Sequence, residues 1–336
     1  MMPSPKAAFM TALLQSRAAK SVTADAVARI SANADGNELR ENLRGTDVGR
    51  RLGESTLQGR RERDGFLWEY LDEQFLLIEE SPFFPRGAVS FGRAYVRKFD
   101  LANIKARLRS IAAGKALPLI PVGILRRRGL LDDFAEADSS EDMAEILRFA
   151  GLGEYAAELS AAEDAPGMPE TTSLDAVFHR GLAAVARGLE GGTVLAHACG
   201  VLLDYANLSV LLRAVSGDWG APAEKQFIPP GYMLSGQEFK EALSTGAKDV
   251  AKRIEYPAYR SVAEEAAAGT SAGVDEIIAK HRFIHLRGLL AAQVAPPCVA
   301  AWYLLSKEAE VRNTRLLLKA AEDGFSFEAA RRCMVL

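Results

Sequence analysis

The sequence predicts an all-α fold, and three observations support this prediction. First, apolar residues recur at three- and four-residue spacing in residues 66–78, 176–189 and 274–290, which is typical of helices with one buried face. Second, the sequence has no long runs of alternating β-branched residues, and this argues against a sheet. Third, an acidic residue followed three positions later by asparagine occurs three times, each time within a helical pattern.

The three copies of this acidic-x-x-Asn motif predict an internal repeat. They are Asp100 with Asn103, Asp204 with Asn207, and Glu310 with Asn313. The copies start 104 and 106 residues apart, and they account for half of the six asparagines in the chain. A repeat of about 100 residues has the size of a small domain, and it exceeds the roughly 20 to 50 residues of solenoid units. The chain is therefore predicted to be triplicated, with approximate threefold symmetry.

The predicted domain boundaries lie near Lys115 and Gly220. They divide the chain into helical repeat domains at residues 1–115, 116–220 and 221–336. Residues 120–123 and 228–231 share an Ile-Pro-x-Gly sequence after the first two copies, and this sequence predicts a turn that links one unit to the next.

The C-terminal end of each repeat helix is predicted from two kinds of residue. A basic residue is expected in the last turn, where it complements the negative helix end, and a glycine is expected as the left-handed cap. The basic residues are Arg109, Arg213 and Lys319, and the glycines are Gly114, Gly217 and Gly324. In the second unit, Ser173 is expected to be the N-cap of the helix that follows it.

The composition is that of an ordinary globular protein, with 49% apolar and 25% charged residues. The net charge of −3 is the difference between 41 basic and 44 acidic residues, so bulk charge does not predict nucleic-acid binding. Neither a membrane span nor a signal peptide is expected. The odd number of cysteines (Cys199, Cys298 and Cys333) predicts reduced thiols.

No motif in the sequence predicts catalysis. Residues 87–93 are rich in glycine but lack the Lys-Ser/Thr pair that a phosphate loop requires. His281 and His285 are one helical turn apart without an evident third metal ligand. We therefore expect no catalytic residue, cofactor, metal or direct small-molecule substrate.

The acidic-x-x-Asn pairs and the arginine runs each have two interpretations. The acidic-x-x-Asn pairs either tie each helix to nearby backbone, which is the favoured interpretation, or line a common axial cavity that meets a partner. Arg126, Arg127 and Arg128 either form a solvated helix face or contact an acidic partner or lipid headgroups. The same choice applies to Arg331 and Arg332.

Four segments carry a resemblance to a known family. The most specific is residues 301–319, through Tyr303, Leu304, Lys307, Glu308, Glu310, Asn313 and Arg315. The others are residues 99–109, 204–213 and 227–234, the last with Pro230 where the family usually has glycine. Together they resemble the C subunit of vacuolar/archaeal-type rotary ATPases and ATP synthases, the equivalent of the d subunit of eukaryotic vacuolar proton pumps.

The resemblance implies a funnel of three helical domains around a pseudo-threefold axis with a central cavity. It implies a non-catalytic rotor subunit whose cavity receives central-stalk subunits of the D and F type. Its other face would rest on the membrane ring of proteolipid subunits, at the cytoplasmic side, as a peripheral protein. Torque passing through it would couple ATP hydrolysis or synthesis to proton or sodium transport.

Two alternatives to this function remain from the sequence. A helical scaffold or adaptor would bind soluble partners through a surface groove. An all-helical hydrolase would need a cavity with converging titratable groups.

Overall fold

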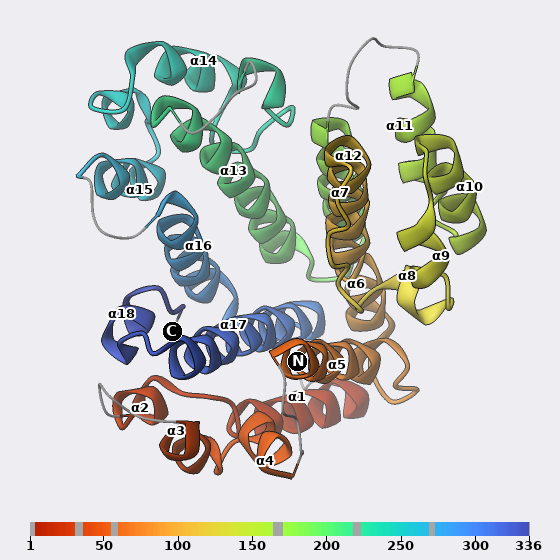
Figure 1. The fold of residues 1–336 in the computed structure, drawn as a ribbon, viewed down its shortest axis with the longest axis vertical. Helices are drawn as coiled ribbons and strands as arrows, with labels where there is room; N and C mark the ends of the chain where they lie inside the picture. Colours follow the sequence, from red (N-terminus) through yellow and green to blue (C-terminus); the bar gives the residue numbers. More distant parts are fainter. Residues whose placement is uncertain are drawn as a thin grey trace.

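The computed structural model describes residues 4–30, 36–54, 60–163, 171–217, 223–268 and 273–335. Every regular element in these ranges is a helix (Figure 1), so the all-α prediction is confirmed. The helices lie in three groups around the middle of the view in Figure 1.

The first group contains both ends of the chain (Figure 1). Its helices are α1 (Pro5–Ala18), α2 (Ala24–Ala28), α3 (Gly36–Leu43), α4 (Asp47–Glu54), α5 (Arg60–Glu79), α17 (Pro296–Asp323) and α18 (Phe327–Arg332). The long α17 packs against α1, α3 and α5, although more than 200 residues separate them in the sequence.

The second group continues the chain from α5. Its helices are α6 (Arg86–Tyr95), α7 (Arg97–Ala113), α8 (Ile124–Arg127), α9 (Leu131–Glu136), α10 (Ser140–Ala150), α11 (Gly153–Glu163) and α12 (Thr171–Arg187). In Figure 1, α7 and α12 lie on the inner side, whereas α8 to α11 lie on the outer side. Helix α6 also contacts α17, and this contact joins the second group to the first.

The third group is built on two long helices that pack against each other, α13 (Thr193–Val215) and α16 (Val274–Leu290). Its outer elements are α14 (Gly236–Thr245), α15 (Pro257–Ala267) and two short 3₁₀ helices, η1 (Ala223–Gln226) and η2 (Val250–Arg253). Helix α13 also packs against α12 of the second group. The predicted unit 221–336 thus contributes helices to two groups. The domain boundaries and the funnel shape stay predictions.

The predicted helix ends are partly correct. Gly114, Gly217 and Gly324 all have positive φ, at 59°, 82° and 69°, as expected for the residue after a helix. Only Arg213 lies in a last turn, because α7 and α17 extend past Arg109 and Lys319. The N-cap prediction for Ser173 is wrong, since α12 already begins at Thr171.

One connected hydrophobic core runs through all three groups, from Met10 in α1 to Met334 after α18. Close-packed interiors have few voids and deform little. The three groups are therefore mechanically joined by their side chains as well as by the chain.

Helix α13 is the one described helix that is long and apolar enough to cross a membrane. Just over half of its most apolar window, 56%, is buried inside the fold. It packs between α12 and α16, and its polar Asp204 and Asn207 are fully buried with protein partners. We interpret it as a core helix, because it packs against two neighbouring helices and its polar side chains have protein partners.

Candidate interaction sites

The three repeated asparagines make the same pair of hydrogen bonds. Each side-chain amide donates to the carbonyl of one backbone residue and accepts from the N–H of that same residue, using both of its polar ends. The pairs are Asn103 with Ile120 (2.9 and 2.7 Å), Asn207 with Ile228 (3.1 and 2.7 Å) and Asn313 with Val335 (2.6 and 2.9 Å). All three asparagines are at most 1% exposed.

In the first two copies, the acidic residue of the motif accepts hydrogen bonds from backbone N–H groups. These groups lie a few residues after the isoleucine that the asparagine binds. Asp100 accepts from Ile124 and Leu125, at 2.9 and 3.0 Å, where α8 begins. Gly123 makes this approach possible: a Cβ atom there would lie 2.6 Å from Oδ1 of Asp100. The Ile-Pro-x-Gly segment of residues 120–123 is therefore the segment that the first motif holds in place.

The second copy repeats this arrangement with more donors. Asp204 accepts the N–H groups of Tyr232, Met233 and Leu234, at 2.8, 2.6 and 3.1 Å, and the hydroxyl of Tyr259, at 3.0 Å. Desolvation by burial raises the pKa of Asp204, while these hydrogen bonds oppose the rise. The same cause raises the pKa of Asp100 to about 6.

The third copy differs because its acidic residue bonds to the beginning of the chain. Glu310 accepts the N–H of Val22 at 2.8 Å and the hydroxyl of Tyr70 at 3.1 Å. Lys307 donates to Glu310 at 2.7 Å, and both side chains are 1% exposed. A backbone N–H of the N-terminal segment thus bonds the acidic residue of the third copy, as the N–H groups of residues 124–125 and 232–234 do in the other two copies.

None of these six motif side chains lines a described cavity; all are buried against backbone of their own group. This placement supports the structural interpretation over the axial-cavity alternative. The basic residues near the helix ends are dispersed: Arg109 and Lys319 are exposed, whereas Arg213 forms an ion pair with Asp275.

Other residues of the repeat helices do line a shared cavity of about 430 Å³. Lys105 of α7, Tyr205 and Ser209 of α13, and Arg312 of α17 all face it, together with residues of α12 and α16. We call this space the axial cavity, because all three repeat helices contribute to its wall. Among its members, the sequence pointed to Arg213 as a repeat-helix residue. The other polar members carry no sequence signal, because the polar face of a helix that lines a cavity has the same composition as one that faces solvent.

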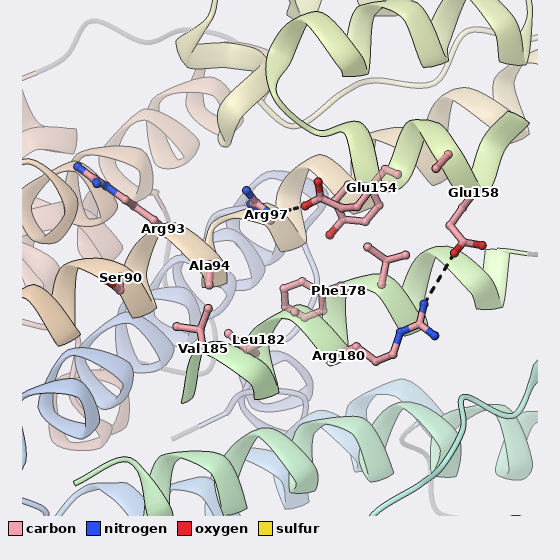
Figure 2. Close-up of a pocket in the computed structure, with 14 residues that line it drawn as sticks. Ser90, Arg93, Ala94, Arg97, Glu154, Glu158, Phe178, Arg180, Leu182 and Val185 are labelled. Carbon is pink, nitrogen blue, oxygen red and sulfur yellow. Dashed lines mark hydrogen bonds and ion pairs between the residues drawn. The ribbon is translucent and has the colours of Figure 1, made fainter. Parts of the chain in front are cut away.

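A second, larger groove of about 760 Å³ lies between α6, α11 and α12 (Figure 2). Its charged side chains pair across it: Arg97 bonds Glu154, and Arg180 lies 3.7 Å from Glu158. Phe178 provides part of an apolar wall between these pairs. The groove therefore has its charges largely neutralised from within the chain.

The histidine pair is divided between different partners. His281 Nε2 lies 2.7 Å from a carboxylate oxygen of Glu265, while His285 stacks on Tyr256. Within the described residues, no group of three or more His, Cys, Asp or Glu side chains could hold a metal ion.

The arginine run of α8 is split by its contacts. Arg127 forms ion pairs with Asp72 at 2.9 Å and with Glu79 at 2.6 Å, and its side chain is 20% exposed. Arg126 and Arg128 are exposed. At the other end of the chain, Arg331 donates to the carbonyl of Ile30, and Arg332 pairs with Glu328.

Comparison with known proteins places this arrangement in a family. Residues 10–333 match the family described as ATP synthase (C/AC39) subunit. The C subunit of the A-type ATP synthase of Pyrococcus abyssi is 30% identical over 131 residues, and that of Pyrococcus horikoshii is 31% identical over 132 residues. Each alignment covers 37% of this chain and spans 35% of the archaeal protein's length. The family match over nearly the whole chain shows that the protein belongs to the ATP synthase (C/AC39) subunit family.

Proposed function

We propose that this protein is a non-catalytic rotor subunit of a vacuolar/archaeal-type ATPase or ATP synthase. It joins the central stalk to the membrane rotor ring and transmits torque, so that ATP hydrolysis or synthesis is coupled to proton or sodium transport. The observation that carries the proposal is the family match over residues 10–333. Its partners are then central-stalk subunits of the D and F type and the proteolipid subunits of the ring.

The packing of the molecule suits a part that must transmit force. One connected core cluster links all three groups, and such interiors resist deformation. The hydrogen bonds of Asn103, Asn207 and Asn313 tie each repeat helix to the segment after it. Glu310 joins the last repeat helix to the first residues of the chain. Rotation applied to one group is therefore passed to the others.

We assign the stalk to the axial cavity and the ring to an outer face of the molecule on the cytoplasmic side of the membrane. The ring has many identical subunits and this body has three unequal groups, so several comparable polar contacts are expected there instead of one pocket. Arg126 and Arg128 are candidates for such contacts because they are exposed. Arg127 is already held by Asp72 and Glu79.

The test is reconstitution of the motor with and without this chain. Without it, the soluble motor should still hydrolyse ATP, but membrane vesicles should show no ATP-driven ion uptake. Adding the purified chain should restore uptake, and the chain alone should hydrolyse no ATP. Ion uptake at the wild-type rate in the absence of the chain would refute the coupling role.

A further inference from the structure

The charges around the axial cavity do not balance. Four cations line it, Lys105, Arg213, Arg282 and Arg312, together with two carboxylates, Asp175 and Asp275. Both carboxylates are already used: Lys105 bonds Asp175 at 2.6 Å, and Arg213 bonds Asp275. Two of the four positive charges, those of Arg282 and Arg312, are left over.

Arg282 of α16 and Arg312 of α17 have no hydrogen bond or ion pair with any residue in the described part of the chain. Both are half-buried, and both also line the neighbouring cavity of about 250 Å³. Glu308 in that second cavity pairs with Lys98 through Oε2, and its buried Oε1 has no hydrogen-bond partner among the described residues. Asp275 and Glu276 act on Arg312 only through space.

The two arginines also disfavour each other. Desolvation lowers the pKa of Arg312, and repulsion from Arg282 lowers it further. A half-buried charge without a directly bonded counter-ion destabilises a fold unless something else provides one. Two such groups on adjacent helices, beside a cavity with unfilled volume, are typical of a site that is completed by a partner.

We propose that Arg282 and Arg312 bind carboxylates of a protein segment that enters the axial cavity, the end of a central-stalk subunit. This inference rests on the proposed function and specifies the charge of the stalk residues at the contact. The guanidinium forks of the two arginines bind planar carboxylates in bidentate fashion.

The lining favours a protein segment over a free anion. Tyr205, Val210 and Ile278 give the same cavity apolar surface, which suits the stems of Glu or Asp side chains and their neighbours. A volume of about 430 Å³ is equivalent to on the order of a dozen waters, which is far more than one small anion fills.

The experiment measures binding of purified central-stalk subunits to the wild-type chain and to the double variant Arg282→Gln/Arg312→Gln. The double variant should bind on the order of 30-fold more weakly or worse, since a desolvated charge contact is lost. Raising the KCl concentration should weaken wild-type binding and have little effect on the variant. Arg253→Gln is the matched control, because Arg253 is exposed on η2 in the outer part of the third group. It should bind like the wild type, and thermal melting should show all three proteins folded.

The outcomes separate this inference from the proposed function. Wild-type affinity in the double variant would overturn the inference and leave the coupling role standing. Failure of the wild-type chain to bind stalk subunits would overturn both. Inorganic phosphate tests the competing possibility that the two arginines bind a free anion. Tight phosphate binding that the double variant loses, with stalk binding unchanged, would show that the site takes a free anion and would also refute the inference.

Discussion

At the scale of single residues, the repeated asparagine provides hydrogen-bond partners for backbone N–H and C=O groups outside the helix. The segments after α7 and α13 are not helical at residues 120 and 228, so their backbone N–H and C=O groups need partners. Asn103 and Asn207 supply a donor and an acceptor from one side chain. An aspartate at either position would lack the donor, and a leucine would lack both groups.

The first prediction concerns Asn207→Leu. Because the variant leaves the N–H and C=O of the buried Ile228 without partners, it should lower the free energy of unfolding by about 1–3 kcal/mol. Urea denaturation followed by circular dichroism measures this change. Gln237→Leu makes a similar amide-to-leucine change on the exposed surface of α14 and should stay within about 0.5 kcal/mol of the wild type. A fully stable Asn207→Leu protein that loses a binding partner would reverse the structural interpretation.

At the scale of elements, the link after each repeat helix matters as much as the helix. Gly123 and Gly231 both have positive φ, at 112° and 77°. They turn the chain so that the following N–H groups point at Asp100 and Asp204. The shared Ile-Pro-x-Gly sequence therefore corresponds to one local structure. The isoleucine backbone bonds the motif asparagine, the glycine turns the chain, and the backbone N–H groups that follow bond the motif aspartate.

The second prediction compares Gly123→Ala with Gly129→Ala. Both positions have positive φ, so an alanine is strained at each; Gly123, with φ 112° and ψ −172°, lies in a region that essentially only glycine occupies, where strain costs on the order of 1–3 kcal/mol. A Cβ at 129 meets nothing within 4 Å, whereas one at 123 meets the carboxylate of Asp100. Gly123→Ala should therefore be the less stable variant by about 1–3 kcal/mol or more, because its backbone is strained in a glycine-only region and because Asp100 loses contact with its donors. Equal urea midpoints for the two variants would show that the turn does not depend on Asp100.

At the scale of the whole molecule, the third repeat is completed by the N-terminal part of the chain. Lys307 bonds Ser21, Tyr70 and Glu310, at 2.7, 2.9 and 2.7 Å. Glu310 also holds the N–H of Val22. This buried ion pair connects α17, α5 and the segment between α1 and α2, so it links residues almost 300 positions apart.

The third prediction removes this pair stepwise. Lys307→Met leaves the Glu310 carboxylate buried without its counter-ion and should lower the free energy of unfolding by about 3–5 kcal/mol. Lys307→Met/Glu310→Gln removes both charges and should lose clearly less than the single variant. Lys252→Met breaks an exposed pair with Asp249 and should change stability by no more than about 1 kcal/mol. A double variant as unstable as Lys307→Met would contradict the role of the pair.

Much of the fold was predictable from the sequence because it depends on local rules. Helical periodicity gave the region of α5 and the bounds of α16, and positive-φ glycines marked the ends of α7 and α17. The recurrence of acidic-x-x-Asn identified the residues that hold the three links. The last-turn cation was predicted wrongly at Arg109 and Lys319, because nothing local stops those helices before the glycine.

The sequence by itself determined that the chain is helical, that an acidic-x-x-Asn motif recurs in three helices, and which polar side chains each copy reuses, because these properties follow from spacing along the chain. Only the tertiary structure decided that Glu310 bonds Val22, that Arg127 is neutralised by Asp72 and Glu79, and that Arg282 and Arg312 share one cavity without an ion pair to any described residue. Those contacts join residues from different helices. Whether a charge finds a partner depends on distances in space, which no spacing along the chain specifies.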